Sequence, residues 1–357
     1  MKFEDILEIK NGRNQRAVEN PRGKYPIYGS GGIMGYADDY ICDAYTVIIG
    51  RKGNINNPIF VEEPFWNVDT AFGLSANTDV ILPRFLYYFC KKFDFERLNK
   101  TVTIPSLTKS DLLKIEIEPP NLLQQRDIVE RLTKIERIIA LRKLELKLLD
   151  ELIRARFVEM FGDIRYEEKY QGIPLRRLCT TISGGTPSTK CSEYYEGNIP
   201  WISTVSLGPN YIDGSTAKGY ITQEAIDNSA TKLIPAGNIL FGTRVGVGKS
   251  SINDVALCIN QDIVAIVGID KNRFNVLFIK YVLDTYQSYY DSIKKGATIL
   301  GITGDDLKNT LIPVPPLELQ NQFADFVKVV DKSKAVVQKA LDQTQQLFDS
   351  LMQEYFG

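Results

Sequence analysis

The sequence predicts an α+β protein made from two copies of one unit, each a mixed α/β domain followed by a long helix. The two helices are expected to pair as an antiparallel coiled coil. Two observations carry this prediction: the chain repeats itself, and two stretches of about forty residues contain neither glycine nor proline. A pseudo-twofold repeat suits a pseudo-symmetric target or a pair of identical partners.

The repeat is clearest at the end of the chain. Residues 298 to 357 align with residues 103 to 162 at a constant offset of 195 and without a gap. Upstream the offset drifts through 193 and 192 to 172, with one insertion of about twenty residues early in the second copy. The front of each copy has therefore varied in length while the back has not. This difference predicts that the N-terminal part of each copy determines specificity and that the C-terminal part has a mechanical role.

The front of each copy reads as mixed α/β. Short β-branched or aromatic runs predict buried strands at residues 47–49, 239–241 and 263–267, whereas residues 85–93 and 277–283 predict helices. Glycine-rich loops follow these elements, and the sequence contains YGSGGIMGY, GRKG, SGGTP and GTRVG. Glycine allows a backbone to approach a ligand closely, so these loops could cradle phosphates or bases, with an ordinary tight turn as the alternative.

The predicted segments are a first domain (1–120), a central helix (121–162), a second domain (163–316) and a C-terminal helix (317–357). Apolar residues alternate at spacings of three and four along both helices, which is typical of a coiled-coil seam. The residues expected to pair are Ile128, Leu132, Ile135, Ile139, Leu146 and Ile153, with Phe323, Val327, Val330, Val337, Leu341 and Phe348. Polar intrusions at Arg142, Lys334 and Thr344 favour one register. The alternative is that each long helix packs only on its own domain.

Composition excludes several classes of protein. The chain of 357 residues has no histidine, which removes histidine metal sites and Ser-His or Cys-His nucleophilic pairs. Its five cysteines form no close CxxC pair, so we expect no metal site and no disulfide framework. No apolar run approaches the roughly 20 residues of a membrane span, and we expect a cytoplasmic protein that contacts no membrane.

The order of motifs resembles the DNA-specificity subunit of type I restriction-modification enzymes. The chain contains YPIYGSGG, TVIIGRKG and SLTKSDLLKIEIEPPNLLQQRDIVERL, then GGTPS, IPWIS and ILFGTRVGVGKS. The resemblance implies two target-recognition domains, each reading one half of a bipartite site in double-stranded DNA. It further implies that the helices set the spacing and dock two modification (methyltransferase) subunits, which restriction subunits then join. The chain itself would be non-catalytic and bind no cofactor, with S-adenosylmethionine expected on the modification subunits.

The candidate DNA contacts are polar and basic residues of the glycine-rich loops and of the stretches that precede the long helices. Arginine and lysine reach guanine edges and phosphates. The candidates are Tyr28, Ser30, Arg51, Lys52, Lys100, Thr101, Thr103 and Lys109 in the first copy, and Thr186, Lys190, Arg244, Lys249, Lys294, Lys295 and Thr298 in the second. The alternatives are solvated turns, charged helix ends and, for Tyr28 and Ser30, the end of a strand. The 43 basic against 44 acidic residues do not by themselves indicate nucleic acid, so partner subunits would supply further phosphate contacts.

The sequence also bears on two other classes of function, an enzyme and an adaptor. The segment Asn57-Pro58-Ile59-Phe60 is a poor match to an adenine-methyltransferase loop, and GVGKS at residues 246–250 lacks the first glycine of a phosphate loop. Neither pattern favours an enzyme. A two-domain adaptor that binds no nucleic acid also fits the composition, and salt-sensitive retention of DNA would separate it from the DNA-binding interpretation.

Overall fold

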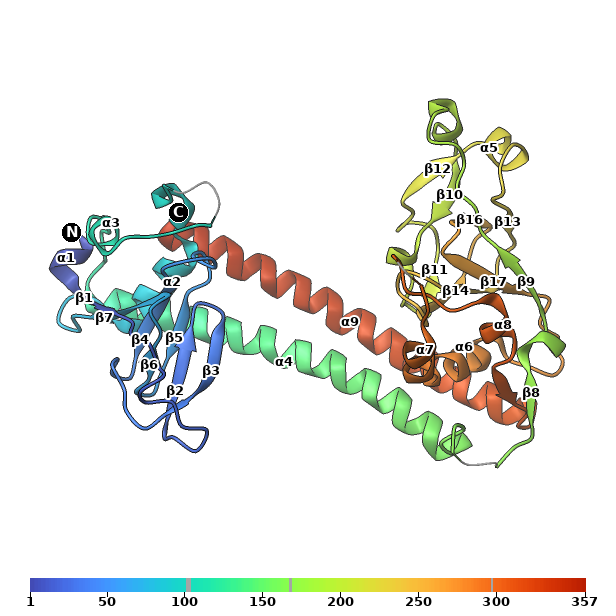
Figure 1. Cartoon of the computed structure of the whole chain (residues 1–357), viewed down its shortest axis with the longest axis horizontal. Helices are drawn as coiled ribbons and strands as arrows, with labels where there is room; N and C mark the ends of the chain where they lie inside the picture. Colours follow the sequence, from blue (N-terminus) through green and yellow to red (C-terminus); the bar gives the residue numbers. More distant parts are fainter. Residues whose placement is uncertain (101–103, 167–168, 297) are drawn as a thin grey trace. The chain divides into compact units, whose positions relative to one another are not determined.

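The computed structural model describes residues 1–100, 104–166, 169–296 and 298–357. The chain divides into two compact units, one formed by Met1–Leu146 with Val336–Gly357 and the other by Lys147–Ala335. Both units contain part of each long helix, α4 (Leu122–Phe161) and α9 (Leu317–Phe356) (Figure 1). The predicted α+β class and the two uninterrupted helices are confirmed. The units cut across the segments expected from the sequence because each takes a part of both helices.

The first unit combines two sheets with short helices. A four-stranded antiparallel sheet has the order β1-β7-β4-β5, and a three-stranded sheet has the order β3-β2-β6. The elements are α1 (Phe3–Ile6), β1 (Leu7–Asn11), β2 (Tyr25–Gly29), β3 (Gly32–Ala37), β4 (Thr46–Gly50), β5 (Ile59–Val61), β6 (Trp66–Asn67), β7 (Ala71–Ala76), α2 (Pro83–Lys92), η1 (Phe95–Leu98) and α3 (Lys109–Leu112). Its core includes the fully or almost fully buried rings of Phe3, Phe72 and Phe85.

The second unit repeats this plan with more strands. Its larger sheet has the order β11-β15-β14-β17-β9, and the others are β12-β10-β16-β13 and β18-β8. The strands are β8 (Gly172–Pro174), β9 (Thr180–Ser183), β10 (Ile199–Ile202), β11 (Tyr211–Ile212), β12 (Gly219–Ile221), β13 (Leu233–Ile234), β14 (Ile239–Gly242), β15 (Ser250–Asn253), β16 (Leu257–Ile259), β17 (Ile263–Val267) and β18 (Leu311–Pro313). The helices are η2 (Leu175–Arg177), η3 (Ser192–Tyr195), η4 (Thr204–Ser206), α5 (Gln223–Asp227), α6 (Val276–Thr285), α7 (Gln287–Ile293) and α8 (Gly304–Lys308).

The long helices pair in antiparallel fashion, as predicted. In the first unit Leu132 and Ile139, near the start of α4, share a buried cluster with Leu341 and Phe348, near the end of α9. In the second unit Phe157, near the end of α4, shares a buried cluster with Phe323 and Val327, near the start of α9. The twelve residues expected to pair are all buried or half-buried. The alternative, in which each helix packs only on its own domain, is not what the structure shows.

The polar interruptions of the seam have partners. The guanidinium of Arg142 donates to the backbone oxygen of Ala340 and to the hydroxyl of Thr344 across the first unit's helix pair. In the second unit the Lys334 ammonium lies 2.6 Å from a carboxylate oxygen of Asp150. Because each polar group meets a matching group only in this alignment, these contacts favour the observed register over a shifted one.

A buried glutamine in each copy of the repeat makes the same set of hydrogen bonds. The side chain of Gln125 accepts from the Leu82 amide (2.8 Å) and donates to the carbonyls of Val80 (2.9 Å) and Pro120 (2.8 Å). Gln320 is the equivalent residue of the second copy. It accepts from the Asn275 amide (2.9 Å) and donates to the carbonyls of Arg273 (3.1 Å) and Pro315 (2.9 Å). Each glutamine thus connects the start of a domain helix, α2 or α6, to the start of a long helix.

We expect Gln125→Ala to lower the free energy of unfolding by about 2–3 kcal/mol, because it leaves three backbone groups without their buried partner. Its exposed neighbour Gln124 provides a matched control, since Gln124→Ala should stay within about 0.5 kcal/mol of the parent. Urea unfolding of the full chain measures both. Equal effects of the two substitutions would contradict the assignment of Gln125 as the residue that connects α2 to α4.

Candidate nucleic-acid interface

Four of the predicted DNA contacts of the first unit lie together. Arg51 and Lys52 follow β4 directly, and both side chains are exposed. The Ser30 hydroxyl, in the turn between β2 and β3, lies 3.5 Å from the backbone oxygen of Lys52. Tyr28 precedes this turn in β2, and its half-buried ring packs edge-on against Phe65, with 5.4 Å between ring centroids. Burial raises the pKa of the Tyr28 phenol, so this group stays a neutral donor and acceptor.

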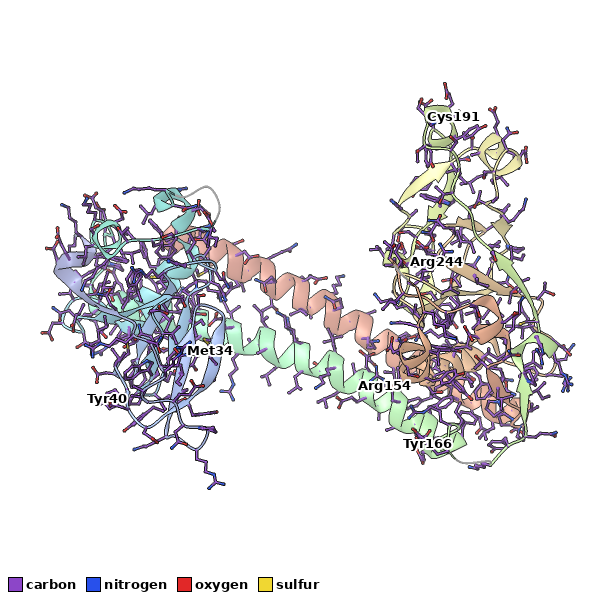
Figure 2. The ribbon with its side chains drawn as sticks, in the orientation of Figure 1. Met34, Tyr40, Arg154, Tyr166, Cys191 and Arg244 are labelled. Atoms are coloured by element: carbon purple, nitrogen blue, oxygen red, sulfur yellow. The ribbon has the colours of Figure 1, made fainter. Side chains whose placement is uncertain are left out.

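The second unit uses the same construction. In the first unit the backbone amide of Leu107 donates to the carbonyl of Arg51 (2.9 Å). At the equivalent position of the second unit, the backbone amide of Ile302 donates to the carbonyl of Thr243 (2.8 Å). This bond ties the loop after β14 to the stretch before α8. As a result Arg244 and Lys295 line one shallow pocket of about 290 Å³ (Figure 2 labels Arg244). The sequence places these two cations far apart, and the structure brings them together.

Several of the predicted lysines are engaged within the protein. Lys100 contacts the carboxylate of Asp111 at 2.9 Å, and this bond holds the pKa of Asp111 below its ordinary value. The ammonium of Lys109 donates to the backbone oxygen of Ile9 (2.7 Å), and Lys294 pairs with Asp291. The Lys294–Asp291 pair, at the end of α7, agrees with the charged-helix-end alternative. Thr101 and Thr103 lie outside the described residues.

Four candidates of the second unit are exposed at loops. Thr186 donates from its hydroxyl to the side chain of Gln261, while Lys190 in a turn and Thr298 in a bend are exposed. Lys249 is exposed in the turn between β14 and β15. Because Ser250 then begins a strand and not a helix, this turn has no helix N-terminus to hold a phosphate. The rejection of GVGKS as a phosphate loop agrees with this geometry.

The aromatic residue of IPWIS is part of the core. Trp201 is 5% exposed, and its indole nitrogen donates to the backbone oxygen of Gly185 at 3.1 Å. The bond anchors the SGGTP loop against β10. Trp201 therefore holds a candidate DNA loop in place without being available to stack on a base.

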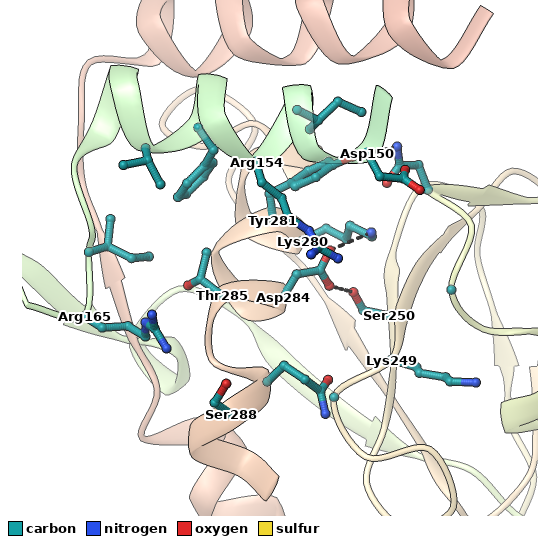
Figure 3. Close-up of a pocket in the computed structure, with 18 of the residues that line it drawn as sticks. Asp150, Arg154, Arg165, Lys249, Ser250, Lys280, Tyr281, Asp284, Thr285 and Ser288 are labelled. Atoms are coloured by element: carbon teal, nitrogen blue, oxygen red, sulfur yellow. Dashed lines mark hydrogen bonds and ion pairs between the residues drawn. The ribbon is translucent and has the colours of Figure 1, made fainter. Parts of the chain in front are cut away.

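A cleft of about 870 Å³ in the second unit lies between the end of α4, the α6–α7 junction and the loops at residues 208–210 and 248–250 (Figure 3). Its most buried cation is Lys280, which pairs with Asp284 at 2.8 Å. Asp284 also accepts a hydrogen bond from Ser250 (2.7 Å), as the dashed lines in Figure 3 show. On another wall of the cleft Lys334 pairs with Asp150. The Ser250–Asp284 bond therefore joins β15 to α6, and the Lys334–Asp150 pair separately joins the two long helices.

The exposed apolar pair Ile33 and Met34 was not among the predicted contacts, although both residues stand in the YGSGGIMGY segment. Their side chains are 55% and 62% exposed at the β2–β3 hairpin. Two apolar residues after consecutive glycines are a usable signal in the sequence, whereas a search for DNA contacts by residue type selects only polar and basic side chains.

The described residues also bear on metal binding and on membrane insertion. Among the described residues no group of three or more histidine, cysteine, aspartate or glutamate side chains could hold a metal ion. Across the same part of the chain, every helix is too short or too polar to cross a bilayer.

Comparison with known proteins defines the class of this chain. The family model for the type I restriction modification DNA specificity domain matches residues 1–151 and 167–345. The chain belongs to this family. It matches twice, which agrees with the internal repeat. The structure of a type I restriction-modification system S subunit from M. genitalium covers 100% of this chain and 95% of its own, with a TM-score of 0.66 at 16% identity, and thus shares the fold.

Two relatives are similar over part of their length. The MjaIX specificity subunit of Methanocaldococcus jannaschii is 32% identical over 158 residues, which cover 44% of this chain. The EcoR124I/EcoR124II specificity subunit of Escherichia coli is 35% identical over 159 residues, which cover 42% of this chain. In both cases the matched part amounts to 37% of the relative, so the chain spans well under half of the length of these relatives.

Proposed function

We propose that this chain is the DNA-recognition and scaffold subunit of a type I restriction-modification complex. Each domain reads one half of a bipartite site in double-stranded DNA. The long helices set the spacer between the halves and dock two modification subunits, and restriction subunits join this core. The observation that carries the proposal is the repeated loop construction, in which the same backbone bond, to Arg51 in one unit and Thr243 in the other, positions a basic loop.

The local charges support DNA as the ligand. In the first unit Arg51 and Lys52 are exposed beside the polar turn at Ser30, and in the second Arg244 and Lys295 line the same pocket. Basic groups position a protein on phosphates, and polar groups in the same loops can contact base edges. Because acidic residues match basic ones over the whole chain, we expect the modification subunits to add phosphate contacts.

Catalysis and cofactor binding belong, in this proposal, to the partner subunits. The chain has no histidine, and its methyltransferase-like segment continues into strand β5 at Ile59. S-adenosylmethionine would therefore bind the modification subunits, and this chain would act where the host DNA lies, in the cytoplasm.

The test uses the purified full chain, alone and with its modification subunits. We expect no heat of S-adenosylmethionine binding and no methylation or cleavage of DNA by the chain alone. We also expect DNA retention by the complex that falls steeply as salt rises, because each neutralised phosphate releases counterions. Binding of the cofactor at a 1:1 ratio would refute the non-catalytic role. Retention that does not depend on this chain would favour the adaptor alternative.

A further inference from the structure

The β2–β3 hairpin of the first unit carries an exposed apolar pair beside its tip, which is formed by Ser30 and Gly31. Tyr25–Gly29 and Gly32–Ala37 pair as an antiparallel ribbon, with a register shift between Ile27 and Tyr28. At the start of strand β3, directly after Gly32, Ile33 and Met34 are 55% and 62% exposed (Figure 2 labels Met34). Because the two residues are consecutive, they form a small exposed apolar patch, and such a patch indicates a contact surface.

The backbone of the same turn is open. A side-chain carbon added at Gly31 or at Gly32 would meet no atom within 4 Å. Gly32 has a φ of +120°, which requires glycine, whereas Gly31 has neither a positive φ nor a close neighbour. The fold therefore does not need glycine at position 31. A missing side chain at an open turn instead leaves room for a ligand to approach the backbone.

The tip lies beside the basic loop of the same unit. The Ser30 hydroxyl lies 3.5 Å from the backbone oxygen of Lys52, and a side-chain carbon at Gly50 would meet the Ser30 Cβ at 3.0 Å. Arg51, between these residues, has its guanidinium 5.8 Å from the centroid of the Phe72 ring and remains exposed. The surface thus combines the apolar pair Ile33 and Met34 with two cations that lie next to the hairpin tip. This combination fits a polyanion that also carries apolar groups, as double-stranded DNA does.

We propose that the β2–β3 hairpin enters the major groove and that Ile33 and Met34 contact thymine methyl groups of the half-site read by the first domain. This inference rests on the proposed function. A two-stranded ribbon fits the major groove, and the thymine methyl is the apolar group displayed there. Arg51 and Lys52 then contact flanking phosphates, while Gly31 and Gly32 allow the turn to approach the base edges.

The test replaces thymine with deoxyuridine, which removes only the methyl group. Binding is measured for the complex of the full chain with its modification subunits, on DNA carrying the methylated motif of the wild type. We expect substitution throughout the first domain's half-site to weaken binding about three- to ten-fold, in line with the burial of one or two methyl groups. The double variant Ile33→Ser/Met34→Ser should bind thymine DNA more weakly by a similar factor. It should respond to deoxyuridine by less than about two-fold.

Two controls separate this inference from the proposed function. Leu233→Ser changes an aliphatic side chain that is 44% exposed in the second unit, and this variant should keep the full response to deoxyuridine. Thermal unfolding of the double variant should match the parent. If wild type binds its motif but does not distinguish deoxyuridine, or if the double variant still does, the hairpin contact is wrong while the function stands. If the wild-type complex binds no specific DNA, the proposed function itself fails.

Discussion

Replacing residues 163 to 316 with the matching segment of a relative that recognises a different site is expected to change one half of the methylated motif and leave the other half intact. The two units have separate hydrophobic cores, so the loops of the first unit do not depend on the packing of the second. The old sequence should disappear completely from the exchanged half of the motif, because each mismatched base pair lowers the binding free energy by about 1–3 kcal/mol.

The exchange must preserve the contact between the second domain and the helix pair. The ring of Phe157 in α4 stacks on Phe278 in α6 at 6.0 Å and lies edge-on to Phe323 in α9 at 5.3 Å. An incoming segment should therefore carry an aromatic residue at position 278. The reciprocal exchange of residues 1 to 120 is the matched control and should change the other half. A change in both halves from either exchange would argue against independent recognition.

Lengthening both long helices by four residues is expected to lengthen the unread gap and to keep both half-site sequences. The insertions belong between Arg142 and Asp150 in α4 and between Lys334 and Thr344 in α9, because this placement keeps both cross-helix contacts. Four helical residues add about 6 Å, which is close to one or two base steps. Four residues also turn the helix by only a small angle relative to the seam, so pairing continues through a local stutter.

The methylated motif of the insertion variant measures this effect. A variant with four alanine substitutions in the same stretches and no added residues controls for altered side chains and should keep the parental gap. Retained methylation with an unchanged gap in the insertion variant would show that the helices do not set the spacing.

Much of the fold could be predicted because its signals are local or periodic. The strand expected at residues 47–49 is β4, and the helix expected at residues 85–93 is α2, displaced by two residues at its start and one at its end. Proline residues before each long helix and glycine after it define the ends of α4 and α9. The two helix seams could be matched to each other because their apolar spacing is regular over forty residues.

The candidate site was only partly predictable, because it depends on contacts between distant segments. No local pattern reveals that Arg244 and Lys295 line one pocket, or that Lys109 is bound to the backbone of Ile9. Residue type alone also does not give a side chain's surroundings. The predicted phosphate contact Lys100 pairs with Asp111 in the structure, and Ile33 and Met34, whose apolar side chains suggest a core, are exposed.

The most direct test of the central claim is the methylome of cells that express this chain with its cognate modification subunits, compared with cells that express the modification subunits alone. We expect one bipartite motif, methylated only when the chain is present, with two defined halves separated by a gap of constant length. Identical methylation in the two cultures, or a single uninterrupted motif, would contradict the account of two recognition domains joined by a helical spacer.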